Sequence, residues 1–117
     1  MVLMDGSPLI ENEKKEDILI LHITGRLDAI ASPKAEKKVL DFVNSGEKYL
    51  VLDLKGVDYL SSAGMRMLLA TMKKLKGLSG KCVVCSITPN VMDVLKMSGF
   101  DHVLNIADDV HDALNKF

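Results

Sequence analysis

Short, nearly unbroken runs of apolar residues recur along this chain, and they predict the strands of a sheet. The runs cover, in chain order, residues 17–23, 49–54 and 82–87, and residues 7–13, which are more polar, are expected to form a weak strand before them. Continuous apolar runs of this length are typical of strands that are covered on both faces. A turn near residues 14–16 would join the first two strands as an antiparallel hairpin. Residues 102–104 would add a short fifth strand at an edge.

Helix signals fall in the intervals between these runs. Ser32 and Pro33 predict a helix start, with Ser32 as the N-cap and Pro33 at the first helical position, and Gly46 ends this helix after Asn44. Three further helices are expected from Ser61 or Ser62 to just before Gly77, from the cap Thr88 with Pro89 at the first position to Gly99, and over residues 108–115. Strands that alternate with helices predict right-handed crossovers. We expect one α/β domain over residues 1–117, with a four- to five-stranded mixed sheet and about four helices.

Composition and charge exclude several classes of function. The formal net charge is −1 and only 4% of the residues are aromatic. A nucleic-acid-binding protein would need a basic field or stacking platforms. The apolar runs are too short to span a bilayer, and the N-terminus lacks the pattern of a signal peptide. We therefore expect a cytoplasmic protein that binds neither nucleic acid nor membrane.

The two cysteines, Cys82 and Cys85, form a C-x-x-C spacing inside a predicted strand. Strand positions three apart point to opposite faces and lie about 10 Å apart. A disulfide needs Cα atoms within about 7 Å. A second cysteine pair or a histidine pair that could complete a zinc site is absent from the sequence. We interpret both cysteines as small buried apolar residues, and we expect no metal and no cofactor.

The second predicted helix has apolar residues on two faces. The expected core face consists of Met65, Leu68, Leu69, Met72 and Leu75. The expected solvent face consists of Ala63, Met67, Ala70 and Lys74. Met67 would then be exposed, either as an ordinary single exposed residue or as the centre of a docking strip of small residues. The same exposed methionine would also favour a weak homodimer.

Two serines and a glycine open this helix. One of Ser61 and Ser62 is expected to cap the helix. Gly64 in the first turn costs about 1 kcal/mol relative to alanine, which predicts close approach by another chain or by a phosphate-bearing ligand. A phosphate at a helix N-terminus is tolerated by the free amides and the helix dipole. Phosphorylation of Ser62 would therefore act on a partner packed over the helix end, and would leave the helix itself folded.

The order and spacing of several short motifs resemble those of STAS domains, and in particular of anti-sigma factor antagonists of the SpoIIAA and RsbV type. The motifs are TGRLD (24–28) followed by SP (32–33), VLDL (51–54) followed by YLSSAGM (59–65), and SITPNV (86–91) followed by MSGF (97–100). The resemblance covers nearly the whole chain. It implies a mixed sheet with helices mainly on one face.

The resemblance also implies a function and a site. An antagonist of this family binds an anti-sigma factor that is also a serine kinase, and that kinase inactivates it by phosphorylating the residue two before the glycine. The acceptor here is Ser62, and Gly64 is the glycine. Ser61 replaces the family's acidic residue and is the less favoured acceptor. The partner surface would consist of Asp28, Ser61, Ser62, Ala63, Gly64, Arg66, Met67 and Ala70. A serine phosphatase is a second candidate partner, and the protein would be a monomer or a weak homodimer.

Asp28 has two interpretations. Its carboxylate could bond to amides of its own loop, or it could belong to the partner and phosphorylation surface that the resemblance implies. Asp53 and Asp58, which flank the loop before the second helix, are weaker candidates for that surface.

Catalysis has little support in the sequence. Neither a Gly-x-Ser-x-Gly elbow nor a phosphate-binding Gly-x-x-x-x-Gly-Lys-Ser/Thr loop is present. The three histidines, His22, His102 and His111, are not placed near Ser62 by the sequence. Two alternatives to the antagonist stay open: a STAS interaction module in a stressosome-like or two-component-linked assembly without a phospho-switch, and a STAS domain that binds a nucleotide or small ligand.

Overall fold

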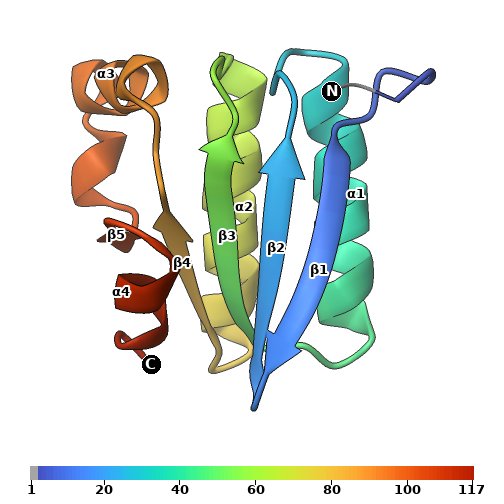
Figure 1. The fold of residues 1–117 in the computed structure, drawn as a ribbon. Helices are drawn as coiled ribbons and strands as arrows, with labels where there is room; N and C mark the ends of the chain where they lie inside the picture. Colours follow the sequence, from blue (N-terminus) through green and yellow to red (C-terminus); the bar gives the residue numbers. More distant parts are fainter. Residues whose placement is uncertain (1–2) are drawn as a thin grey trace.

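The computed structural model describes residues 3–117, and its five strands form one sheet in which the spatial order follows the chain order (Figure 1). The strands are β1 (Leu9–Lys15), β2 (Ile18–Thr24), β3 (Tyr49–Gly56), β4 (Lys81–Cys85) and β5 (Ile106–Ala107). The β1–β2 pair is antiparallel and the other three pairs are parallel. This confirms the predicted mixed sheet.

Helices connect the parallel strands, and one more helix follows the last strand. They are α1 (Ala31–Asn44), α2 (Ser62–Gly77), α3 (Pro89–Ser98) and α4 (Val110–Leu114), with a short 3-10 helix at Phe100–His102. Helices α1 and α2 lie side by side behind the sheet (Figure 1). Helix α4 packs on the opposite face against β3, β4 and β5. None of the helices between residues 3 and 117 has the length and apolar character that crossing a membrane requires.

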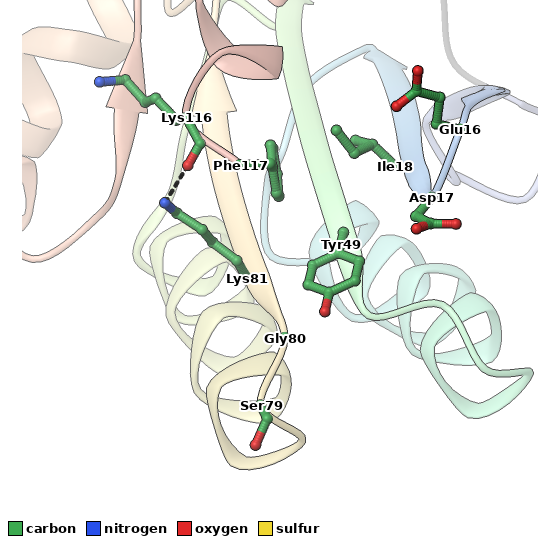
Figure 2. Close-up of a pocket in the computed structure, with 9 residues that line it drawn as sticks. All are labelled: Glu16, Asp17, Ile18, Tyr49, Ser79, Gly80, Lys81, Lys116 and Phe117. Carbon is green, nitrogen blue, oxygen red and sulfur yellow. Dashed lines mark hydrogen bonds between the residues drawn. The ribbon is translucent and has the colours of Figure 1, made fainter.

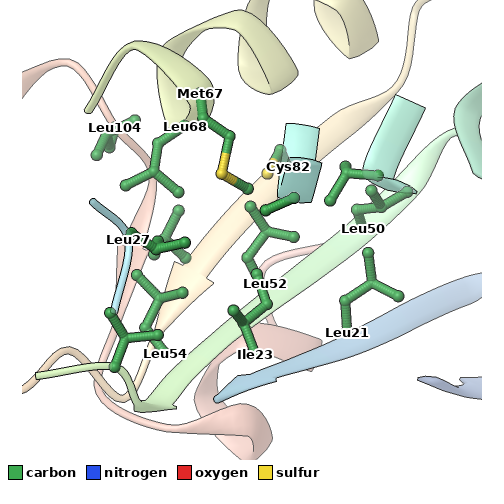
Figure 3. Packing of buried hydrophobic residues seen from close by; sticks show 14 of the residues in the cluster. Leu21, Ile23, Leu27, Leu50, Leu52, Leu54, Met67, Leu68, Cys82 and Leu104 are labelled. Atoms are coloured by element: carbon green, nitrogen blue, oxygen red, sulfur yellow. The ribbon is translucent and has the colours of Figure 1, made fainter. Parts of the chain in front are cut away.

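The two faces of the sheet bury separate apolar clusters. The larger cluster lies between the sheet and helices α1 and α2, and Figure 3 shows part of it. Cys82 belongs to this cluster and Cys85 to the smaller one on the other face, which confirms the prediction that they are buried and point apart. Burial raises the pKa of the Cys82 thiol to about 12 and is the main cause that raises the pKa of Cys85 to about 11. Both cysteines are therefore protonated and inert at neutral pH.

The edges of the sheet differ from the prediction. The fifth strand is not at residues 102–104, because Gly99 adopts a φ of 78° after α3 and a 3-10 turn follows it. Pairing with β4 begins only at Asn105, whose carbonyl accepts from the N–H of Val84 at 2.8 Å. At the other edge the hairpin is confirmed, but Lys15 pairs with Ile18, so the turn lies at residues 16–17.

The start of α1 was also predicted wrongly. The helix begins at Ala31, so neither Ser32 nor Pro33 has the expected position. Asp28 takes the capping role, since its Oδ1 accepts from the N–H groups of Ile30 (3.1 Å) and Ala31 (2.8 Å). Pro33 is the third residue of α1, within the first turn, where a proline is tolerated. This confirms that the Asp28 carboxylate bonds to amides of its own loop.

The start of α3 agrees with the sequence, with Thr88 as the N-cap residue and Pro89 at the first helical position. The Thr88 hydroxyl does not cap the helix, however. It donates to the carbonyl of Val57 at 2.8 Å and thereby ties the start of α3 to the loop that leads into α2.

Candidate functional site

Ser61 ties the N-terminus of α2 to the loop that follows β2. Its N–H and its hydroxyl both donate to the carbonyl of Leu27, at 2.9 and 2.7 Å. The same hydroxyl oxygen accepts from the N–H of Gly64 at 3.2 Å. Leu27 in turn donates its N–H to Tyr59 and pairs with Leu60 as an isolated parallel bridge. Ser61 is therefore the N-cap of α2, and its hydroxyl is occupied on both sides.

Ser62 has the opposite character. It is the first residue of α2 and is exposed. The first turn that it opens carries no acidic side chain, so the positive end of the helix dipole is not neutralised there. The two adjacent serines thus differ: the hydroxyl of Ser61 is hydrogen-bonded on both sides, and Ser62 is exposed.

Gly64 is required by packing within this chain. A Cβ on Gly64 would lie 2.6 Å from Cδ1 of Leu60 and 2.9 Å from the carbonyl oxygen of Leu27. The sequence predicted that another chain or a phosphate-bearing ligand approaches here. The structure corrects this prediction. The atoms nearest to Gly64 belong to Leu27, in the loop after β2, and to Leu60, which lies just before α2, so they come from the same chain.

Met67 was predicted to be exposed, and this is wrong. Its exposed fraction is 0%, and Figure 3 shows it among buried leucines such as Leu68 and Leu52. The fully buried face of α2 consists of Gly64, Met67, Leu68, Thr71 and Leu75. Gly64 and Thr71 belong to this buried face although neither is a large apolar residue. The pattern of large apolar residues in the sequence therefore did not indicate where the buried face lies. As a buried residue Met67 cannot be a partner contact, and the argument that it favours a homodimer is lost.

The other residues predicted for the partner surface differ in their accessibility. Arg66 is exposed, and Ala63 and Ala70 are half-buried. Asp28 is half-buried and caps α1. Asp58, one of the weaker candidates, is exposed and accepts from the side chain of Asn90 at 3.2 Å.

Sequence reasoning missed an exposed pair beside this helix start. The guanidinium carbon of Arg26 lies 4.1 Å from the centroid of the Tyr59 ring, a cation–π distance. Tyr59 and Ile30 are 41% and 65% exposed. Arg26 precedes Leu27 and Tyr59 precedes Leu60, so this pair lies beside the link between the two segments. Because the link joins segments far apart in sequence, no local pattern indicates that these side chains surround the start of α2.

A second missed cluster lies in the sheet, on the face opposite α1 and α2. His22 Nδ1 is 2.6 Å from Oδ2 of Asp53, and His22 Nε2 is 2.8 Å from Oε1 of Glu13. Burial alone would lower the pKa of His22, but the hydrogen bonds and charges of the two carboxylates outweigh it and raise that pKa. Both ring nitrogens face acceptors, so the doubly protonated imidazolium satisfies both. The Asp53 carboxylate is therefore paired with His22 on this face of the sheet and does not contribute to the surface at the start of α2.

Replacing His22 should make stability depend less on pH. A group whose pKa is higher in the folded than in the unfolded state stabilises the fold fully below its unfolded pKa, near 6.5, and loses this contribution as the pH rises through the folded value. We expect His22→Gln to lower the free energy of unfolding below pH 6.5 by up to about 1 kcal/mol, a size typical of a partly exposed pair, and by less at pH 8.5. Urea unfolding at a pH below 6.5 and at pH 8.5 measures this difference in the free energy of unfolding. His102→Gln, at a histidine whose side chain is 87% exposed, is the control. Equal losses at both pH values would contradict the assignment.

A large groove lies at the other end of the sheet from Ser62, where the parallel strands begin. It has a volume of about 560 Å³ and is shown in Figure 2. The ammonium of Lys81 lies 5.8 Å from the centroid of the Phe117 ring and donates to the carbonyl of Lys116. The carboxylates of Glu16 and Asp17 also line the groove. Two acidic and two basic side chains line this groove, so it has no excess of positive charge that would favour a polyphosphate.

Comparison with known proteins gives consistent matches. A family model described as the STAS domain matches residues 10–113. The BtrV protein of Bordetella bronchiseptica, which carries the name of an anti-sigma factor antagonist, is 33% identical over 96 residues, covering 82% of this chain and 83% of that protein. The anti-sigma F factor antagonist of Paenibacillus polymyxa is 28% identical over 108 residues, covering 92% of each. The crystal structure of an anti-sigma factor antagonist from Mycobacterium paratuberculosis has a TM-score of 0.86 at 25% identity, covering 99% of this chain and 97% of that one. The similarity thus includes both α2 and the loop after β2.

Proposed function

Because this chain belongs to the STAS domain family, we propose that it is an anti-sigma factor antagonist switched by phosphorylation of Ser62. In the unphosphorylated state it binds an anti-sigma factor that is also a serine kinase, and phosphorylation ends this binding. The observation that carries the proposal is the difference between the two serines at the start of α2. The Ser61 hydroxyl is bonded on both sides, whereas Ser62 is exposed at the positive end of the helix. The names of BtrV and of the relative from Paenibacillus polymyxa support the choice of partner.

The switch would work by charge and not by unfolding. A phosphoryl group adds about two negative charges at neutral pH. The free amides and the dipole at the start of α2 stabilise such a charge locally. A partner packed over this helix end would have to remove the hydration shell of the phosphate, and so would lose affinity. The fold of the antagonist would persist.

We assign no catalytic role to this protein. The carboxylates of Asp53 and Glu13 hold His22 in the sheet, and His102 and His111 lie in the 3-10 helix and in α4. The chain would act in the cytoplasm by binding, with the kinase as one partner and a serine phosphatase as the other.

The direct test is phosphorylation by the candidate serine kinase from the same genome, followed by intact mass measurement and site mapping. We expect one added phosphoryl group, located on Ser62, and none on Ser62→Ala. Ser62→Asp should lose binding to the partner while its urea unfolding midpoint stays within experimental error, and Ser62→Ala should bind constitutively. Modification at Ser61 alone would contradict the proposal, as would partner binding that is unchanged in both variants.

One observation favours a second function. Ser61 occupies the position of the acidic residue that precedes the acceptor in the family's switch motif, and here it serves as a helix cap. A STAS module that binds through the same helix without a phospho-switch, in a stressosome-like or two-component-linked assembly, would need only this structural role. Equal partner binding by Ser62→Asp and Ser62→Ala would support this second function.

A further inference from the structure

We propose that Arg66 is the positioning residue that holds the phosphoryl group on Ser62, and that this pairing withdraws Arg66 from the surface offered to a partner. The proposal rests on the proposed function, since it specifies what the modified Ser62 does. It concerns the modified state of the protein and makes Arg66 part of the switch.

The geometry of α2 places the two side chains one above the other. The helix is continuous from Ser62 to Gly77, and residues four apart on a helix are neighbours on its surface. Because each Cα–Cβ bond tilts toward the helix N-terminus, the Cα–Cβ bond of Arg66 points back toward the turn that Ser62 opens. Both residues are exposed, so neither has to leave a packed position to meet the other.

Arg66 is the cation that is available for this role. None of the ion pairs formed among residues 3–117 involves it. Arg26, the other arginine beside the helix start, already lies against the Tyr59 ring. Lys73 and Lys74 are three turns further along α2, about 16 Å or more from Ser62 along the axis. The uncharged first turn offers no carboxylate that would compete for the guanidinium.

The pairing changes the surface in two ways at once. In the unmodified protein the Arg66 guanidinium can donate to an acidic group of a partner. After phosphorylation, the phosphate oxygens on Ser62 accept from the same guanidinium within one helix. The modification would therefore add negative charge and also occupy a positive contact. The ability of Arg66 to pair bidentately, which lysine lacks, suits it to a phosphate.

The test places phosphoserine at position 62 during translation, so that it does not depend on any kinase. The second pKa of the phosphate, ordinarily about 6, is then followed by phosphorus NMR as a function of pH. A nearby guanidinium stabilises the dianion, so we expect this pKa to be about 0.2–0.4 unit higher in Arg66→Gln, the shift that corresponds to one helical ion pair. Arg26→Gln and Lys74→Gln remove the same charge elsewhere and should leave it unchanged. Thermal unfolding of each exposed-site variant verifies that it is folded.

The outcomes separate this proposal from the function on which it rests. A phosphate pKa that is the same in Arg66→Gln and in the unaltered sequence would overturn the pairing, and so would an equal or larger shift in Arg26→Gln. Failure of the kinase to modify Ser62 would overturn the proposed function but would leave the NMR result unaffected, because the phosphoryl group is introduced independently.

Discussion

Gly64→Ala should destabilise the protein by about 1–3 kcal/mol, although alanine is the better helix former. The new Cβ would lie 2.6 Å from Leu60 Cδ1 and 2.9 Å from the Leu27 carbonyl oxygen. The Leu60 methyl can turn away, but the carbonyl is backbone and also accepts both hydrogen bonds of Ser61. Overpacking of this kind outweighs the gain of about 1 kcal/mol in helix propensity. Urea unfolding followed by circular dichroism measures the loss.

The matched control for Gly64 is in the same helix. A Cβ on Gly77 would meet nothing within 4 Å, so Gly77→Ala should be neutral or slightly stabilising. We also expect Gly64→Ala to slow phosphorylation of Ser62, because the shifted Leu27 carbonyl disturbs the cap beside it. Equal stability changes at positions 64 and 77 would show that the close contact with Leu27 is not present in solution.

Met67→Ala should cost about 2–5 kcal/mol, the usual range for truncating a large buried side chain. Met67 is 0% exposed and packs in the larger cluster, so the substitution leaves a cavity between α2 and the sheet. Met97 is the matched control, since it also lies in a helix but is 89% exposed. We expect Met97→Ala to change the free energy of unfolding by no more than about 0.5 kcal/mol.

This pair of variants also separates the two roles that Met67 could have. If Met67 were a partner contact, Met67→Ala would weaken partner binding and leave the urea midpoint unchanged. A core residue gives the reverse, with a lowered midpoint and partner binding that is retained wherever the variant remains folded.

The sequence was most informative where local chemistry decides the structure. Thr88 followed by Pro89 marked the start of α3 because a fixed φ and a missing N–H suit the first turn of a helix. The alternation of strand side chains was enough to place Cys82 and Cys85 on opposite faces. The mixed sheet followed from the order of strands and helices.

It was least informative where several local solutions compete. Asp28 and Ser32 are both good capping residues, and only the surrounding fold selects Asp28. Helix α2 has apolar residues on most of its circumference, so the buried stripe is fixed by which side can approach the sheet most closely. The missing side chain of Gly64 lets this face of α2 lie close to Leu27. Thr71 can be buried on the same face because its hydroxyl donates to the Met67 carbonyl within the helix, at 2.9 Å.

For the candidate site, the sequence placed Ser61 and Ser62 at the start of a helix, as in the structure, but it did not indicate the long-range contacts around them. Local sequence does not decide whether Ser61 or Ser62 caps the helix, because the Leu27 carbonyl that binds Ser61 comes from 34 residues earlier in the chain. The Arg26–Tyr59 stack depends on the same long-range link. Such contacts are set by tertiary packing, and local residue preferences do not report them.

The bond between Ser61 and Leu27 has a consequence for how the chain is recognised while it is being made. A peptide cut from the start of α2 contains Ser62 but lacks the Leu27 carbonyl, and a lone helix of 16 residues is marginal in water. An enzyme that recognises the capped helix end, and not the bare sequence, would pass over such a peptide. It would equally pass over nascent or misfolded copies of the protein. The phosphorylated fraction of the protein would then contain only molecules that have already reached the native state.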